Sequence, residues 1–141
     1  MDEDALADLF APAGQARIKR MFGGKGVYLD GVIVAVELSD GVLYLKGDAQ
    51  TAPAYEAAGA RRWVYAGETK DGAARRVAMP YWTMPDEAYD DEEALLRFVG
   101  LAREAARRAE AAKARNAPKK PGADKKKSAG PQSRGGARKV P

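Results

Sequence analysis

The chain contains no cysteine and no histidine among its 141 residues. The first absence excludes disulfides, thiolate metal sites and cysteine nucleophiles, and the second removes the usual base of catalytic triads and the commonest transition-metal ligand. Apolar runs are also short, because no segment approaches the roughly 18 consecutive apolar residues of a membrane span. The sequence therefore predicts a protein without a membrane span, a metal site or another cofactor.

The composition also disfavours two further classes, namely proteins with a targeting peptide and enzymes. Basic residues are missing from the N-terminal segment Met1-Asp2-Glu3-Asp4, where a targeting peptide would need them, so we expect a cytoplasmic protein. An enzyme that lacks histidine and cysteine has to use carboxylates, lysine or tyrosine, and no paired constellation of these groups stands out. The chain is therefore predicted not to be an enzyme.

Charged residues are abundant, and their signs are unevenly divided along the chain. Residues 1–112 hold 14 Lys and Arg against 19 Asp and Glu, a net charge of −5, whereas residues 113–141 hold 10 against 1, a net charge of +9. The second segment has no aromatic residue, and Val140 is its single branched aliphatic residue. It cannot bury enough apolar surface to offset roughly 1–2 kcal/mol of ordering entropy per residue. We predict a folded domain over 1–112 and a disordered basic tail over 113–141.

Helical periodicity is found near both ends of this domain. Leu6, Leu9 and Phe10 form one stripe of a short helix, which Pro12 and the glycine after it should end. The apolar residues between 95 and 109 follow the same period, and residues 90 and 93 resemble a capping box at the start of that helix. A weaker helix is expected over 52–58.

Between the first two helices, the pairs Asp30-Gly31 and Asp40-Gly41 predict two β-hairpins in series. With two-residue loops, the opposed residues would be Leu29 and Val32, Val27 and Val34, Leu38 and Leu43, and Val36 and Leu45. The face predicted to lie under helices then consists of Val27, Leu29, Val32, Val34, Val36, Leu38, Leu43 and Leu45. The opposite face would present Tyr28, Ile33, Ala35, Glu37, Tyr44 and Lys46.

A third hairpin is predicted around Asp71-Gly72, pairing residues 63–66 with 77–80 and placing Glu68 opposite Arg75. The element order is then helix, three strands, helix, two strands, helix. Adjacent antiparallel strands with helices on one side form a two-layer α+β domain. We therefore predict a five-stranded antiparallel sheet with helices on one face.

Four segments of this domain resemble the TfoX/Sxy N-terminal domain family over roughly residues 4–110. They are Arg20-Met21-Phe22-Gly23-Gly24-Lys25-Gly26-Val27-Tyr28, Asp30-Gly31, Leu43-Tyr44-Leu45-Lys46 and Met79-Pro80-Tyr81-Trp82-Thr83-Met84-Pro85. The resemblance implies the same layout, and membership among bacterial regulators of competence for DNA uptake, which act with the cyclic AMP receptor protein at promoters. Full-length regulators of this kind carry a second, helical domain, and the basic tail takes its place here.

The resemblance leads us to predict a surface that binds a protein partner. Its candidate residues are Arg20, Phe22, Gly23, Gly24, Tyr28, Tyr44 and Lys46. The glycines could instead cradle a phosphate, or merely form a tight bend where glycine supplies a positive φ. The two tyrosines with the lysine could stack on nucleobases, or pack as a ladder against residues 79–85 or a dimer partner.

Two charged segments have alternative interpretations. The carboxylates Asp86, Glu87, Asp90, Asp91, Glu92 and Glu93 could bind a hard cation, or act as charges that favour the start of a helix. The tail cations could neutralise nucleic-acid phosphates without reading bases, or only keep the protein soluble. These cations are Lys119, Lys120, Lys125, Lys126, Lys127, Arg134, Arg138 and Lys139. We therefore predict a non-enzymatic regulatory module that binds a protein, with non-specific nucleic-acid binding through the tail as the alternative.

Overall fold

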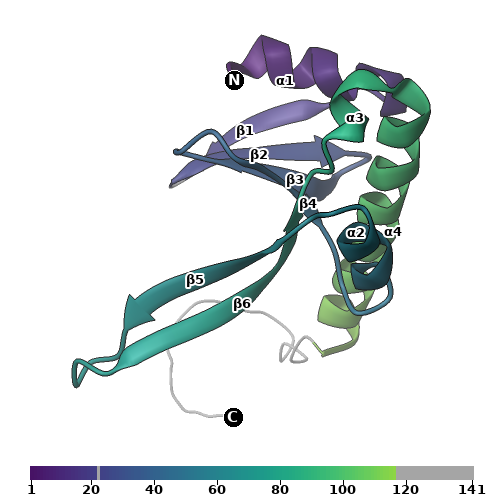
Figure 1. Ribbon diagram of the computed structural model, residues 1–141. Coiled ribbons are helices and arrows are strands. Elements are labelled where there is room, and N and C mark those ends of the chain that lie inside the picture. Colours follow the sequence, from purple (N-terminus) through teal and green to yellow (C-terminus); the bar gives the residue numbers. More distant parts are fainter. Residues whose placement is uncertain (22, 117–141) are drawn as a thin grey trace, which may run out of the picture. The chain divides into compact units, whose positions relative to one another are not determined.

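The computed structural model describes residues 1–21 and 23–116, and the compact unit formed by Met1–Ala111 contains the sheet (Figure 1). Its strands are β1 (Arg17–Met21), β2 (Gly24–Leu29), β3 (Val32–Leu38), β4 (Leu43–Lys46), β5 (Arg62–Glu68) and β6 (Ala74–Thr83). They form one antiparallel sheet in the order β1-β2-β3-β4-β6-β5. The α+β class and the antiparallel sheet are as predicted, but the sheet has six strands and not five.

The additional strand is β1, whose sequence Arg-Ile-Lys-Arg-Met lacks the clear alternation of apolar and polar residues that identifies a strand. Ile18 is partly buried, and the other residues of β1 are exposed. With so few apolar residues, the period-two alternation that identifies a half-buried strand is weak. β1 is specified by its pairing with β2, where Ile18 lies opposite Val27.

The helices are α1 (Glu3–Phe10), α2 (Ala52–Ala57), α3 (Glu87–Asp90) and α4 (Glu92–Asn116), and a 3-10 turn, η1 (Ala11–Ala13), follows α1. The predicted capping box is wrong, because the carboxylate of Asp91 accepts the bond from the Glu93 N–H at 3.0 Å while Asp90 ends α3. Residues 113–116, predicted to be disordered, are the last turn of α4. The rest of the predicted tail, 117–141, lies outside the described residues.

All helices of the compact unit pack on one face of the sheet (Figure 1). The core joins Leu6 and Phe10 of α1, Tyr55 of α2 and the apolar stripe of α4 to the strand residues beneath them. Those strand residues are Val27, Leu29, Val34, Ala35, Leu43, Leu45 and Trp82. We call the other side of the sheet the outer face.

The predicted faces are wrong in the middle of β3. Ala35 lies opposite Val27 while Ile33 lies opposite Tyr28, so Val34 is an extra residue that forms a β-bulge. The alternation is reversed beyond the bulge. Ala35 and Glu37 therefore face the helices, and Val36 lies beside Tyr44 on the outer face.

Loop length explains the other register errors. Asp30-Gly31 is the predicted two-residue turn, with φ of 53° and 82°. After β3, however, the N–H of Leu38 bonds to the carbonyl of Val42, which leaves a three-residue loop ending in Gly41 at φ 85°. Leu43 consequently lies opposite Glu37, not opposite Leu38.

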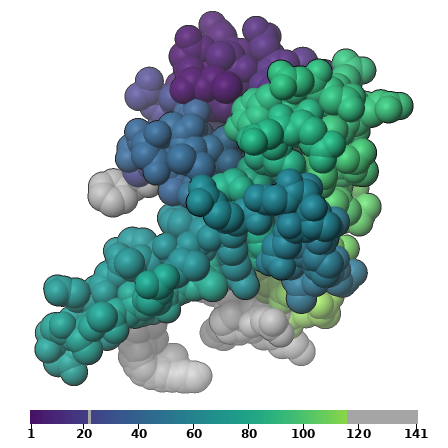
Figure 2. Space-filling model, in the orientation of Figure 1, coloured from purple at the N-terminus to yellow at the C-terminus, as the bar shows by residue number. Residues whose placement is uncertain are grey.

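The β5–β6 hairpin closes in the same manner. The N–H of Thr69 bonds to the carbonyl of Ala73, and Gly72 has φ 85°. Arg75 therefore lies opposite Gly67, and the predicted pairing with Glu68 is wrong by one residue. Figure 2 shows this hairpin standing out from the surface of the unit.

Candidate functional site

The outer face of the sheet carries a cluster of aromatic side chains at its centre. The ring centroids of Tyr44 and Trp63 are 5.7 Å apart, and those of Trp63 and Tyr81 are 6.1 Å apart. The ammonium of Lys46 lies 5.0 Å from the centroid of the Tyr81 ring. Three strands supply the cluster, because Tyr44 and Lys46 are paired with the β6 residues Thr83 and Tyr81, and Trp63 belongs to β5.

A groove of about 670 Å³ adjoins this cluster. One wall is formed by Trp63 and Tyr65 of β5 together with Val77 and Met79 of β6, and the β3–β4 loop forms the other. Tyr65 leaves 54% of its surface exposed, so the groove has an aromatic edge that nothing in the described part of the chain covers. Such a concave and largely apolar surface is suited to side chains of another molecule.

Burial shifts the pKa values of three side chains in the cluster. It raises the pKa of Tyr44, to which the charge of Asp40 adds, and it raises the pKa of Tyr81 as well. Burial also lowers the pKa of Lys46, against the opposing attraction of Glu110 and Asp48. These tyrosines are therefore hydrogen-bond donors and packing surfaces near neutral pH, and are poorly suited to act as nucleophiles.

The structure separates the predicted protein-binding residues into two groups. Tyr28, Tyr44 and Lys46 lie on the outer face. Arg20 belongs to the row that includes Glu37 on the helix-covered face, and its Nε donates to Glu3 of α1 at 3.1 Å. Phe22 lies outside the described residues.

Gly23 and Gly24 lie at the connection of β1 and β2, where their geometry accounts for both residues. Gly23 has φ 88°, which favours glycine, and its carbonyl accepts a bond from the Ser39 N–H at 2.9 Å. A Cβ on Gly24 would overlap the carbonyl oxygen of Glu37. These facts favour the tight-bend interpretation of the glycines over the phosphate cradle.

Beside this connection a buried carboxylate is held by two cations. Glu37 is 5% exposed, and its Oε atoms lie 3.1 Å from the Met1 amino group and 3.5 Å from Lys25 Nζ. The adjoining cavity, of about 480 Å³, is lined by these groups, Arg20 and the two glycines. Because the lysine and the arginine here already contact the first residues of the chain, this group of charges mainly holds α1 to the sheet.

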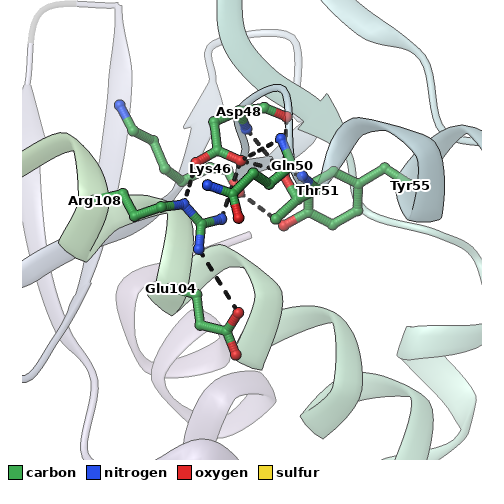
Figure 3. Close-up of polar contacts among 7 residues, drawn as sticks. All are labelled: Lys46, Asp48, Gln50, Thr51, Tyr55, Glu104 and Arg108. Atoms are coloured by element: carbon green, nitrogen blue, oxygen red, sulfur yellow. Dashed lines mark hydrogen bonds and ion pairs between the residues drawn. The ribbon is translucent and has the colours of Figure 1, made fainter.

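The backbone carbonyl of Lys46 also belongs to a polar cluster that connects α2 with α4 (Figure 3). The hydroxyl of Tyr55 donates to the carbonyl of Lys46 at 2.7 Å, and burial raises the pKa of that phenol. Two residues further on, Asp48 accepts two bonds from Arg108, at 2.7 and 3.1 Å. Its Oδ1 also accepts from the Thr51 N–H at 3.1 Å, so one carboxylate fixes both the entry to α2 and the position of α4.

Stability should depend on pH through Asp48. The hydrogen bonds from Arg108 lower the pKa of this carboxyl, burial opposes them, and the Thr51 N–H assists them. A carboxyl whose pKa is lower in the folded state stabilises the fold above its ordinary pKa of about 4, and the contribution is lost as the pH falls. We expect Asp48→Asn to lower the melting temperature at pH 7 and to have little effect near pH 2. If the difference in melting temperature between the wild-type chain and Asp48→Asn stayed constant from pH 7 to pH 2, this assignment would be contradicted.

The described residues contain neither a cluster of metal ligands nor a membrane-spanning helix. In residues 1–21 and 23–116, no three carboxylates come close enough together to hold a metal ion. Within the same ranges, none of the helices combines the length and apolar character that crossing a membrane requires.

The fold and the outer face define a two-layer α+β domain whose helices leave one side of the sheet uncovered. The family model of the TfoX N-terminal domain matches residues 8–106 of the sequence, so the chain belongs to the TfoX N-terminal domain family. The resemblance drawn from the sequence motifs is thereby confirmed. No match is found among curated proteins.

The residues that sequence reasoning missed are those that β5 and β6 add to the outer face, chiefly Trp63, Tyr65, Val77 and Met79. Their outward direction follows from period-two alternation in the third hairpin. What the sequence did not reveal is that β6 pairs with β4, which places this hairpin next to Tyr44.

Proposed function

We propose that the chain is a non-enzymatic regulatory module that acts in the cytoplasm and binds a protein partner through its outer face. Membership of the TfoX N-terminal domain family supports a TfoX-like module, and regulation of competence genes is the process that the family resemblance suggests. The single observation that carries the proposal is the groove beside the aromatic cluster, which no other described residue covers. Its walls hold apolar and aromatic side chains of the kind that dominate protein interfaces.

The chemistry of the described residues supports binding over turnover. The buried carboxylate of Glu37 is paired with two cations, and that of Asp48 is occupied by Arg108 and backbone N–H groups. Burial raises the pKa of the Tyr44 and Tyr81 phenols, which makes a phenolate nucleophile less accessible. Acid–base catalysis would need a general base with a free lone pair beside a nucleophile, whereas the carboxylates of Glu37 and Asp48 are already bound.

The double variant Tyr44→Ala/Lys46→Ala tests the proposed surface. Truncating an aromatic anchor and a cation at the centre of an interface should lower recovery of the partner in affinity purification from the native cell about tenfold or more. The melting temperature should fall only modestly, because both side chains are partly exposed. Tyr89→Ala/Arg97→Ala, which removes an exposed tyrosine and an exposed cation on the helical side, is the matched control. Unchanged recovery with a collapsed melting temperature would make Tyr44 and Lys46 purely structural.

The alternative function, non-specific nucleic-acid binding, is supported by the +9 charge of residues 113–141. If the tail binds phosphates, affinity for random duplex DNA should fall steeply with salt and should be lost on truncation after Ala112. Equal DNA binding by the truncated chain would instead assign the affinity to the folded domain.

A further inference from the structure

The outer face differs in charge from the rest of the domain. The six strands contain only two carboxylates, Glu37 and Glu68. Glu37 faces the helices, and Glu68 alternates with the outward Gly67 and so points to the other side. No strand residue on the outer face is therefore acidic, although residues 1–112 have a net charge of −5.

Cations on the outer face also lack carboxylate partners among the described residues. Arg17 and Lys19 of β1, Lys46 of β4 and Arg75 of β6 point outward, and none forms an ion pair with another described residue. Several cations on the helical side, by comparison, are bound to carboxylates. These pairs are Arg20 with Glu3, Lys25 with Glu37, Arg97 with Glu87, Arg103 and Arg107 with Asp30, and Arg108 with Asp48.

Asp40 is the acidic residue at the rim of the groove, and its single charge does not offset the excess of cations on the outer face. It lies in the β3–β4 loop, where its Oδ1 accepts a bond from the Val42 N–H at 3.0 Å. Arg75 lines the same groove. Lys46 is attracted by Glu110 and Asp48, but Arg17, Lys19 and Arg75 form no ion pair with a described residue, which leaves a positive field over an otherwise apolar surface.

We infer that the outer face recognises an acidic segment of the partner protein, whose apolar side chains enter the groove and whose carboxylates meet Arg17, Lys19, Lys46 and Arg75. The inference rests on the proposed function and adds the chemistry of the partner. Opposite charge across an interface speeds encounter and rejects basic competitors, while apolar anchors supply most of the affinity.

The shape of the surface favours a peptide over a nucleic acid. Stacking of successive bases needs a series of open aromatic faces, but the rings of Tyr44, Trp63 and Tyr81 are tilted against one another by 33° and 54°, and the exposed ring at the groove is that of Tyr65. Tyr81 is only 8% exposed. The groove beside them is walled by the aliphatic side chains of Leu38, Val77 and Met79, which match apolar side chains better than flat bases.

A displayed library of random 12-residue peptides, selected on the full-length chain, tests the inference. The basic tail can also bind acidic peptides, so the library is first depleted on a synthetic peptide of residues 113–141. The test variant is Lys19→Glu/Arg75→Glu, which keeps the tail and reverses two outward charges. The control is Lys70→Glu/Arg76→Glu, which reverses two exposed charges that lie away from the groove and form no ion pair with another described residue. Arg75 and Arg76 are neighbours on opposite sides of β6, so the two variants are closely matched.

The selected peptides should be acidic and contain aromatic or aliphatic residues. Fluorescence anisotropy should show about tenfold weaker binding to Lys19→Glu/Arg75→Glu than to the wild-type chain, and a change of less than about twofold for the control. Three results with selected peptides would overturn the inference. They are neutral or basic selected peptides, equal weakening by both variants, and a 15-residue oligothymidylate that binds more tightly than the peptides and is weakened by the outward reversal alone.

Failure of the inference and failure of the proposed function give different results. Neutral or basic peptides that lose affinity with Tyr44→Ala/Lys46→Ala would overturn the acidic chemistry and leave the outer face as a protein-binding surface. Failure to select any peptide would overturn the inference. If partner recovery were also unchanged by Tyr44→Ala/Lys46→Ala, the proposed function would fail with it.

Discussion

Replacing Leu45 with alanine is expected to lower the free energy of unfolding by about 2–5 kcal/mol. Leu45 is fully buried in β4 between its register partners Ala35 and Trp82, under the helices. The loss combines the transfer free energy of the removed methyl groups with the cavity left in a core that cannot collapse around it. Against a total stability of about 5–15 kcal/mol, this is a large fraction.

Chemical denaturation of Leu45→Ala and of Leu96→Ala would check this prediction. Leu96 lies on α4 with 41% of its surface exposed, so its replacement should change stability by no more than about 0.5 kcal/mol. Similar losses for the two variants would show that β4 is not covered by the helices as described.

Gly24→Ala is the second change from which we expect a large effect. The added Cβ would overlap the carbonyl oxygen of Glu37, which is backbone and cannot rotate away. Accommodation requires β2 and β3 to separate where Gly24 lies opposite Leu38, next to the pair formed by Lys25 and Glu37. Overpacking of this kind costs about 1–3 kcal/mol or more, and thermal denaturation would measure it.

Gly26→Ala is a control in the same strand. Its Cβ would meet the side-chain ends of Met21 and Ile33, each at 3.1 Å, and these flexible groups can give way. We expect a smaller loss of melting temperature than for Gly24→Ala. The opposite order would mean that the close approach of β2 and β3 is not a constraint on this sequence.

The local part of the fold was predictable from the sequence because it depends on short-range chemistry. Asp30-Gly31 has the positive φ values of a two-residue turn, and the periodic stripe of α4 lies in the core. Asp40-Gly41 did not define its register, because the same dipeptide also suits a three-residue loop that ends in a glycine with positive φ. The bulge at Val34 has no sequence signal that distinguishes it from regular alternation among valines and alanine.

The candidate site was predictable only as far as Tyr28, Tyr44 and Lys46, which the alternation of β2 and β4 turns outward. The remainder depends on contacts between residues far apart in the chain. Trp63 joins the cluster because β6 pairs with β4, and local turn residues do not encode that pairing. The lack of ion-pair partners for the outward cations among the described residues likewise depends on where the described carboxylates lie in space.

Photo-crosslinking in the native cell would test most directly that the outer face is the binding surface. A photoreactive residue replaces Tyr65, which is 54% exposed at the groove, or Leu96, which is 41% exposed on the helical side. The account predicts a crosslinked protein partner from position 65 and none from position 96. A partner crosslinked from position 96 but not from position 65 would contradict it.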